Sequence, residues 1–379
     1  MTADTLSAAH LSIVRITPKT NWAFVEIEMR SGRRGIGEAT AQGRETELAR
    51  LFREMTKSLI GLTDSGLRRL LADAALPTLA HAAIASALDQ AAWDVTGKRE
   101  GLSMAAAVAV EKRTSIPVYA NINRRTLDRS AAGFAASALD AIGAGHGAVK
   151  IAPFDEVVPE CHRTGSVAQA ARAGLERIAA VRDAIGDRRL MVDCHWRFDA
   201  ASARGVIDAA AELDVHWIEC PLPETEGNLK AIAALHDHAN RRGVLLAGCE
   251  EMIRTEGFAP FLEAGAYDVI MPDVKYAGGM EEMLRLANTA DRHSVKVSLH
   301  NPSGPVCNAA SLQFTAMLDK PDLLEMQFDE TPLFDGIQEG LNSVLQGSVM
   351  LPAKPGLGLS LKEDMLAERM LDRVSVPPS

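Results

Sequence analysis

The chain has 379 residues, of which 47% are hydrophobic and 24% are charged, a composition ordinary for a globular protein that is large enough for a barrel and an accessory domain. Its formal net charge of −10 disfavours nucleic acid and anionic membrane surfaces as partners, and suits a protein that gathers carboxylates around a cation. No apolar run approaches the length of a membrane span, and MTADTLSAAH lacks the basic and apolar regions of a signal peptide, so we expect a cytoplasmic protein.

The first portion of the chain, residues 1–115, predicts an α+β domain. In residues 22–40, WAFVEIEMRSGRRGIGEAT, apolar residues alternate on both sides of Ser31-Gly32, as they do in a β-hairpin. Residues 79–98, LAHAAIASALDQAAWDVTGK, are rich in alanine and leucine and predict a helix that Gly97 ends.

From about Val118 the pattern changes to short apolar runs that alternate with helical stretches. Eight runs predict strands, at residues 118–123, 148–153, 190–196, 217–220, 245–250, 268–273, 296–301 and 323–328. Strands that are buried on both faces have this appearance, and eight alternating units indicate an α/β fold of the (β/α)8 TIM-barrel type. We assign the barrel to residues 116–335.

A charged or imidazole side chain stands at the end of most of these runs, at a steady spacing along the chain. These residues are Asp193, Glu219, Glu250, Asp273, His300 and Glu325. In a βα barrel the carboxyl ends of all strands meet at one rim, which is where such barrels hold their active sites. We therefore expect the six side chains to lie together.

The three acids at the ends of successive runs, Asp193, Glu219 and Glu250, predict a metal site. Clustered carboxylates repel one another unless a cation or shared protons neutralise them, and oxygen ligands suit Mg²⁺. The adjacent pair Glu250 and Glu251 is ambiguous, and the strand phase favours Glu250. The neighbouring Cys194, Cys220 and Cys249 are one residue out of phase with the acids, so we interpret them as buried packing residues rather than ligands.

Further candidates for chemistry stand near the same rim. His300 and Asp273 end neighbouring strands, which can place a carboxylate against an imidazole nitrogen. Lys150 supplies a cation from the second strand. His195 follows Asp193 by two residues, so in a strand both side chains would face the same space, although a polar strand end running into a turn explains the pattern equally well.

The sequence resembles the mandelate racemase-like group of the enolase superfamily, over nearly its whole length and closest in pattern to the acid-sugar dehydratases of the galactonate type. The matching motifs are GIGEAT (35–40), AAIASALDQAAWDVTGK (82–98), WIECPLPE (217–224), AGCE (247–250), YDVIMPDVKYAGGMEE (267–282), HNPSGPVCNAASLQ (300–313) and LPAKPGLGLSL (351–361). The resemblance implies a modified barrel and a capping domain that a C-terminal segment, residues 336–379, returns to complete.

The resemblance also implies roles for the rim residues. Asp193, Glu219 and Glu250 would bind Mg²⁺, and the shared chemistry of the group is removal of the proton α to a carboxylate, where the metal holds the ene-diolate. The remaining roles concern catalysis: His300 with Asp273 as the base dyad, Glu325 as the acid that hydrogen-bonds the enolate oxygen, and Lys150 as the cation that touches the substrate carboxylate.

Two departures from the family pattern bear on the reaction. Racemases of the group carry a second basic residue two positions after the first lysine, where this chain has Ala152, so racemisation by two bases is not expected. His195 matches the general acid of the acid-sugar dehydratases. The implied reaction is elimination of the 3-hydroxyl from an aldonic or aldaric acid, which leaves a 2-keto-3-deoxy acid.

Substrate contacts are predicted from Lys150, Glu325, Asn301 and Asp155. Asp155 belongs to a long excursion after the second barrel strand, residues 153–170, which also holds His162 and Arg163. This loop could compensate for the short turn in the N-terminal domain where relatives carry a longer specificity loop, or it could be a surface loop without a functional role.

Other functions stay open at this point. The chain could be a one-base isomerase, a cycloisomerase, or a dehydratase of another hydroxy or amino acid, with Lys150 reassigned as a base. A non-catalytic barrel that serves as a binding or structural protein is the alternative of a different class. Members of the group are often dimers or octamers, so a homo-oligomer is expected.

Overall fold

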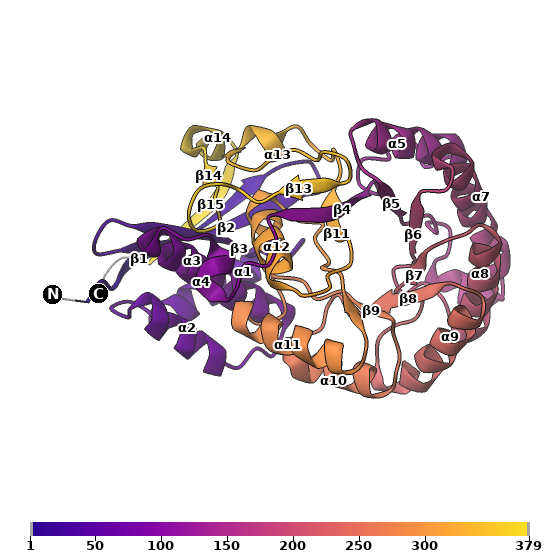
Figure 1. Cartoon of the computed structure of the whole chain (residues 1–379), viewed down its shortest axis with the longest axis horizontal. Coiled ribbons are helices and arrows are strands. Elements are labelled where there is room, and N and C mark those ends of the chain that lie inside the picture. The colour runs from indigo at the N-terminus through magenta and orange to yellow at the C-terminus, as the bar shows by residue number, and fades with distance from the viewer. Residues whose placement is uncertain (1–2, 377–379) are drawn as a thin grey trace.

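The computed structural model describes residues 3–376 as two parts that lie side by side (Figure 1). A smaller part, at the left of Figure 1, combines both ends of the chain, and the barrel lies at the right. The helices α5 (Ala131–Gly143), α7 (Val167–Ile185), α8 (Ala200–Glu212) and α9 (Leu229–Arg241) form the outer wall of the barrel in this view. The architecture agrees with the expected modified TIM barrel and its capping domain.

The capping part contains an antiparallel sheet with the strand order β15-β1-β2-β3. Its strands are β1 (Leu6–Arg15), β2 (Asn21–Met29), β3 (Arg34–Glu38) and β15 (Met370–Val376). The predicted hairpin is confirmed as β2–β3, and Gly32 has the positive φ of 81° that its turn requires. The last strand pairs with the first, so the C-terminal segment does return to this sheet.

Four helices accompany the sheet: α1 (Glu45–Thr56), α2 (Asp64–Asp73), α3 (Leu79–Glu100) and α4 (Met104–Val108). The prediction that Gly97 ends the long helix is wrong, because α3 continues to Glu100 and Gly101 ends it with a φ of 69°. Gly97 instead permits close packing, since a Cβ there would lie 2.8 Å from the Cα of Gly356.

The barrel strands run parallel in the order β10-β9-β8-β7-β6-β5-β4-β11. They are β4 (Ser115–Asn121), β5 (Ala148–Ile151), β6 (Arg189–Asp193), β7 (Trp217–Glu219), β8 (Leu245–Gly248), β9 (Val269–Ile270), β10 (Lys296–Val297) and β11 (Leu324–Gln327). All eight predicted strands are confirmed. Between β10 and β11 the wall is joined by Asp322, whose N–H donates to the carbonyl of Val297 at 3.1 Å, and by Ser298, whose hydroxyl donates to the carbonyl of Leu323 at 2.6 Å.

Most of the strands are shorter than the predicted runs, and β9 and β10 are the shortest. Strands β9 and β10 have two residues each, and the chain beyond them is irregular. Pro272 contributes to this, because it has no N–H to donate to a neighbouring strand. The residues predicted to end these strands, Asp273 and His300, therefore lie on loops just above the barrel wall.

Helices and short elements connect the strands and complete the chain. The helices of the barrel are α5 (Ala131–Gly143), α6 (Pro159–Thr164), α7 (Val167–Ile185), α8 (Ala200–Glu212), η1 (Glu226–Asn228), α9 (Leu229–Arg241), α10 (Arg254–Glu263), α11 (Met280–Arg292) and α12 (Pro305–Met317). The C-terminal segment adds α13 (Leu333–Gly336), β12 (Gln338–Glu339), β13 (Ser348–Met350), β14 (Ser360–Leu361) and α14 (Glu363–Glu368). The division of the chain at residues 115 and 335 stays a prediction.

The interior of the barrel is layered along the strands. A layer of buried side chains fills its centre: Tyr119, Ala148, Met191, Trp217, Ala247, Val269 and Met271. Because every second residue of a strand points inward, the position two residues later on each strand enters the next layer. That step takes Ala148 to Lys150, Met191 to Asp193 and Trp217 to Glu219, so an ionisable layer lies directly above the apolar one.

Buried polar side chains of the capping part bind backbone groups of the barrel. Glu38, at the end of β3, accepts hydrogen bonds from the N–H groups of Gly304 at 2.8 Å and Cys307 at 2.9 Å, at the start of α12. Asp89 on α3 accepts the N–H of Met280 at 2.8 Å, the first residue of α11. Two carboxylates thus satisfy the open N–H groups of two barrel helices.

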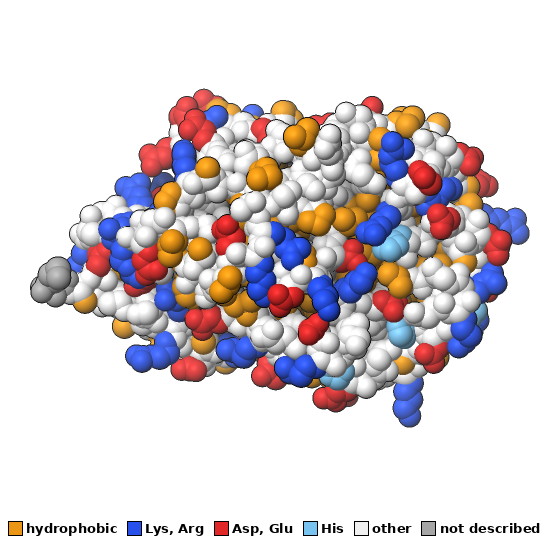
Figure 2. Space-filling view, viewed as in Figure 1, with side chains coloured by type: hydrophobic (Ala, Val, Ile, Leu, Met, Phe, Trp, Pro, Cys, Tyr) orange, Lys and Arg blue, Asp and Glu red, His pale blue; other side chains and the backbone are white. Residues whose placement is uncertain are grey.

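The exterior is mixed in charge. On the face shown in Figure 2, acidic and basic side chains are interspersed over both parts, with hydrophobic side chains between them. Of the helices in residues 3–376, none combines the length and the apolar character that crossing a bilayer demands.

Asp89 predicts a pH dependence of stability. Burial raises its pKa from 3.8 to about 7, so the folded state holds this proton more tightly than the unfolded chain does. The stabilisation from Asp89 is therefore fully present at low pH and is lost as the pH rises through about 7. In the wild type this group should lower the free energy of unfolding by about 3 kcal/mol between about pH 5 and pH 8. Asp89→Asn, which cannot ionise, should lack that decrease in urea unfolding.

The control for this measurement is Asp73→Asn, which changes an exposed aspartate on α2. It should show the same pH dependence as the wild type. An equal loss of stability with pH in Asp89→Asn and the wild type would contradict the interpretation.

Candidate active site

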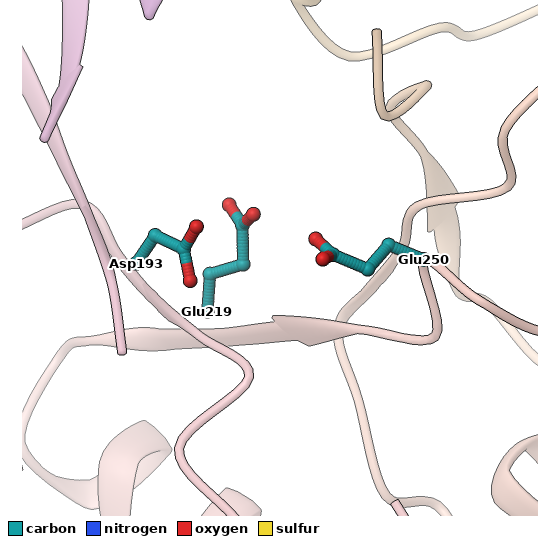
Figure 3. Close-up of side chains that lie close together, drawn as sticks. All are labelled: Asp193, Glu219 and Glu250. Carbon is teal, nitrogen blue, oxygen red and sulfur yellow. The ribbon is translucent and has the colours of Figure 1, made fainter. Parts of the chain in front are cut away.

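Three carboxylates converge at the carboxyl ends of adjacent strands. Asp193 ends β6, Glu219 ends β7, and Glu250 stands two residues beyond β8. One oxygen of each lies within 4.8 Å of the others, and all three side chains are buried. Figure 3 shows their carboxylates pointing toward a common space. The predicted triad is therefore brought together by the barrel.

The backbone beside the acids departs from regular strand geometry. Cys220, just after Glu219, and Cys249, just before Glu250, have φ angles of 45° and 69°. Such left-handed conformations are uncommon for residues other than glycine and often occur at functional sites. The turn at Cys249 directs Glu250 toward the triad, whereas Glu251 is exposed, so the ambiguity of the pair resolves as the strand phase suggested.

The cysteines beside the acids are packing residues, as expected. Cys194, Cys220 and Cys249 are free thiols with exposed fractions of 0–1%. Cys194 and Cys249 belong to the core between the barrel wall and its helices. Burial raises the pKa of all three thiols well above the ordinary value, which makes them poor metal ligands.

His195 lies against Asp193, but not because both residues stand in one strand. Strand β6 ends at Asp193, and the φ angles of His195 and Trp196 are 46° and 56°. This turn folds the imidazole back, so that Nε2 of His195 lies 2.8 Å from Oδ2 of Asp193. The backbone N–H of His195 donates to Oδ1 of the same carboxylate at 2.8 Å. The expected shared space exists, and a turn rather than strand alternation produces it.

Lys150 is buried between two carboxylates. Its Nζ lies 2.7 Å from Oε1 of Glu219 and 3.0 Å from Oε1 of Glu325. Although burial alone would lower the pKa of Lys150, these two charges raise it well above its ordinary value. Lys150 is therefore a permanent cation at the floor of the site, which agrees with an electrostatic role and disfavours a role as a base.

Glu325 is held by amide groups on both sides of the rim. The side-chain amide of Asn121 donates to Oε1 at 2.6 Å, and the N–H of Asn301 donates to Oε2 at 2.8 Å. The side-chain amide of Asn301 donates to the carbonyl of Glu325 and to Asn308, both at 2.9 Å. Although burial raises the pKa of Glu325, Lys150, His300 and the hydrogen bond from Asn301 outweigh it, so that the pKa is lowered overall. Asn301 thus fixes Glu325, and its own contact with substrate stays a prediction.

His300 and Asp273 form the pair that the sequence predicted. The Nδ1 of His300 lies 2.8 Å from Oδ2 of Asp273. The opposite nitrogen, Nε2, faces the triad and lies 3.6 Å from Oε2 of Glu250. With one nitrogen engaged by the carboxylate, the other is directed toward the place where a substrate on the triad would lie.

The residues of the triad fit a divalent cation. Oε2 of Glu250 is buried without a hydrogen-bond partner, and three carboxylates offer the oxygen ligands that Mg²⁺ prefers. Burial, with the neighbouring acidic charges, raises the pKa of Glu250 well above its usual range and that of Glu219 to about 7. Burial acts in the same direction on Asp193, but His195 and Lys150 outweigh it and lower the pKa of Asp193 to about 2. A cation in the common space would favour ionisation of all three.

The loop after β5 contributes a cavity at the edge of the site. Asp155 pairs with Arg129, whose Nε lies 2.7 Å and Nη2 3.1 Å from its two oxygens, so its carboxylate is already engaged. His162 on α6 lies 2.8 Å from the carbonyl of Arg197, and Arg163 pairs with Glu160 on the same helix. His162 and His195 both line a cavity of about 620 Å³. The loop therefore extends the site beyond His195, and contacts of Asp155 with substrate stay a prediction.

Some residues of the site were missed at the level of sequence. The indole Nε1 of Trp217 lies 3.2 Å from Oε2 of Glu219, and Asn121 binds Glu325. Lys275, next to Asp273, was also missed. For Trp217 the signal was present, because it precedes Glu219 by two residues, the spacing that puts strand residues on one face. Lys275 stands in a turn beyond β9, where that spacing does not predict a shared face.

The barrel, its capping part and the acidic triad define a class of metal-site βα barrels, and comparison with known families identifies the group within it. Residues 3–108 match the family described as mandelate racemase / muconate lactonizing enzyme, N-terminal domain, and residues 133–365 match the family described as enolase C-terminal domain-like. The second match alone covers more than half of the chain, so the chain belongs to the family described as enolase C-terminal domain-like.

Curated relatives cover most of the chain. D-galactonate dehydratase of Ralstonia pickettii is 27% identical over 96% of this chain and 94% of its own length, and D-xylonate dehydratase of Haloferax volcanii is 26% identical over 93% and 86%. D-galactarolactone cycloisomerase of Agrobacterium fabrum is 31% identical over 76% and 74%.

Solved structures share the fold. A protein from Zymomonas mobilis superposes with a TM-score of 0.87 at 24% identity, with 99% of this chain and 100% of the other covered. A member of the enolase superfamily from Salmonella Typhimurium gives a TM-score of 0.85 at 20% identity, with 98% and 100% covered. At these identities the structures establish the fold and do not bear on the reaction.

Substitution of Glu250 should separate metal binding from folding. We expect Glu250→Gln to lose most of its affinity for Mg²⁺ in isothermal titration calorimetry, because an amide removes one of the three anionic ligands. Mg²⁺ at about 100 times its Kd should stabilise the wild type by about 2.7 kcal/mol, and should not stabilise this variant. The matched control is Glu251→Gln, one residue away and exposed, which should bind Mg²⁺ as the wild type does. Equal affinity in both variants would contradict the assignment.

Proposed function

We propose that this protein is a Mg²⁺-dependent dehydratase of a sugar acid, either aldonic or aldaric. It would abstract the proton α to the carboxylate and eliminate the 3-hydroxyl, which leaves a 2-keto-3-deoxy acid. The observation that carries the proposal is the placement of two imidazoles, His300 and His195, around one carboxylate triad. The dehydratase names of several relatives are consistent with it.

His300 is the base in this proposal. Asp273 engages its Nδ1, which fixes the tautomer with the proton on that nitrogen and leaves Nε2 to accept the α-proton. The distance of 3.6 Å between Nε2 and Glu250 places this atom at the margin of the triad. A substrate carboxylate on the triad would therefore present its α-carbon to Nε2.

The floor of the site stabilises the negative charge that develops. Asp193, Glu219 and Glu250 would hold the Mg²⁺, which when bound supplies Lewis-acid stabilisation to the substrate carboxylate. Lys150, whose Nζ lies 2.7 Å from Oε1 of Glu219, adds a fixed positive charge. The predicted role of Glu325, a hydrogen bond to the enolate oxygen, requires its protonated form. Because Lys150, His300 and the N–H of Asn301 lower its pKa, the surroundings of Glu325 favour the carboxylate, and this role stays a prediction.

His195 is the proposed general acid. Its imidazole lies against Asp193, half-exposed, and lines the cavity that residues of α6 also border. It can therefore reach a hydroxyl further along the substrate, while His300 faces the α-carbon. Departure of the 3-hydroxyl as water needs a proton, and a positioned imidazole can deliver it. The resulting enol then becomes the 2-keto acid.

The two histidines give distinct expected results in a panel of aldonic and aldaric acids assayed for 2-keto-3-deoxy products. His300→Asn should lose both the elimination and the exchange of the α-proton in D₂O, because both need the base. His195→Asn should lower the elimination rate by about 10²–10⁴-fold, the usual contribution of a general acid, but should retain α-proton exchange.

Controls with EDTA and with restored Mg²⁺ accompany both variants. Product that forms in the wild type and disappears with EDTA would identify the substrate and the metal requirement together. Full activity of His195→Asn would disprove its role as the acid, and a wild type that turns over no sugar acid of the panel would remove the dehydratase proposal.

A cycloisomerase is the second candidate, and one relative favours it. D-galactarolactone cycloisomerase of Agrobacterium fabrum is 31% identical to this chain over the part that matches. This reaction would use the same triad and His300 but would need no departing hydroxyl, so His195 would matter little. Isomerisation of an aldarolactone that survives His195→Asn would support this alternative. Ala152, which stands where a second base would, disfavours a two-base racemase.

The remaining parts of the proposal concern cellular setting. We propose that the enzyme works in the cytoplasm in the catabolism of carbohydrate acids, since an acidic chain with a buried carboxylate site suits small anionic substrates held through a cation. A homo-oligomer, dimer or octamer, is proposed by analogy with the group. Light scattering after size-exclusion chromatography measures it directly.

A further inference from the structure

Lys275 is a buried lysine that the proposed reaction does not use. It follows Asp273 by two residues, on the loop between β9 and α11, and is 3% exposed. A lysine so deeply buried is rare unless its charge is compensated. Its surroundings therefore indicate a specific function near the dyad of His300 and Asp273.

Lys275 binds both oxygens of Asp273. The backbone N–H of Lys275 donates to Oδ1 at 2.8 Å, and its side-chain ammonium donates to Oδ2. Oδ2 is also the atom that lies 2.8 Å from Nδ1 of His300. The carboxylate is thus held from both sides, which leaves it a single orientation toward the imidazole.

The same ammonium reaches the loop that carries His300. It donates to the hydroxyl of Ser303, which is buried three residues after His300. The next residue, Gly304, donates its N–H to Glu38 of the capping part at 2.8 Å. A continuous set of contacts therefore runs from the capping sheet through residues 303–304 and Lys275 to the dyad.

We propose that Lys275 is a positioning residue for the base: it fixes the carboxylate of Asp273 and the loop of His300 relative to each other. The inference rests on the proposed function, in which His300 takes the α-proton. Without the ammonium, Asp273 would be a buried carboxylate whose remaining side-chain partner is His300 itself. The imidazole and the carboxylate could then both change orientation, and Nε2 would leave its direction toward the triad.

The electrostatic state of the pair agrees with this geometry. Burial opposes the charge of both groups, but Lys275 and His300 lower the pKa of Asp273, and Asp273 raises the pKa of Lys275 above its ordinary value. Both groups are therefore charged at neutral pH, so that the contact is an ion pair in a buried setting. Removal of one partner of such a pair has a large effect on the other.

The test replaces Lys275 by Met, which keeps most of the side-chain volume and removes the ammonium. We expect kcat for the best sugar acid to fall by about 100-fold with KM and the Kd for Mg²⁺ unchanged, since displacement of a catalytic group by about 1 Å has effects of this size. The downfield proton resonance of the His300 Nδ1–H, assigned by its loss in His300→Asn, should shift or broaden.

The matched control is Lys98→Met. Lys98 is also the partner of a fully buried aspartate, Asp94, with 2.6 Å between Nζ and Oδ2, but it lies on α3 away from the dyad. It should lower stability while retaining kcat and the His300 resonance. Ser303→Ala is the milder second variant, which keeps the ion pair and removes the contact with the loop; we expect a smaller loss of kcat and a smaller shift of the resonance.

The outcomes separate this inference from the proposed function. A lower kcat together with an altered His300 resonance, in Lys275→Met or, if that variant does not fold, in Ser303→Ala, supports the positioning role. An unchanged resonance, or an altered resonance with unchanged kcat, overturns it. If the wild type turns over no sugar acid, the proposed function fails, and the resonance alone then decides whether Lys275 positions His300.

Discussion

Repulsion between buried carboxylates is the constraint on which the rest of the site depends. Asp193, Glu219 and Glu250 occupy one space, and Glu325 and Asp273 lie close by, all with little access to water. Such a group is stable only if positive charge and hydrogen-bond donors surround it. The chain supplies such groups in fixed positions, among them Lys150, Lys275 and the amides of Asn121 and Asn301 that donate to Glu325. One buried oxygen of the triad, Oε2 of Glu250, has no hydrogen-bond partner. A cation bound by the three carboxylates would balance their charge.

The capping part stabilises the catalytic rim through helix ends rather than through side chains of the triad. Glu38 and Asp89 satisfy open N–H groups at the starts of α12 and α11, the helices that follow His300 and Asp273 in the chain. Burial raises the pKa of both groups above their ordinary values, so the hydrogen bonds rather than a negative charge anchor the two helix starts. The loops that present the base dyad are therefore anchored on both sides, by the barrel wall and by the capping sheet. Helix α3, which carries Asp89, is buried over most of its length.

The two imidazoles of the site reach it by different routes, which suits different tasks. His300 donates from Nδ1 to the carboxylate of Asp273, and its other nitrogen is directed toward the triad. His195 stands on a left-handed turn beyond β6, more exposed, where a cavity begins. In the proposed reaction His300 would be a fixed base beside the triad and His195 an acid at the open edge, which suits an elimination in which the α-carbon is fixed and the leaving group extends outward.

Much of the fold and the centre of the site could be predicted from the sequence, because both follow from periodicity. Eight apolar runs with a charged residue at the end of most of them specify a βα barrel with an acidic rim, and the step of two residues from Trp217 to Glu219 or from Met191 to Asp193 specifies which side chains enter it. The tertiary structure alone decided the irregular parts: the turn that folds His195 back, the length of α3 beyond Gly97, and the ion pair of Lys275 with Asp273. These features arise where the backbone leaves regular geometry or where residues distant in the chain meet, so local patterns carry little information about them. Periodicity determines which residues face inward, and packing between elements determines what each of them touches.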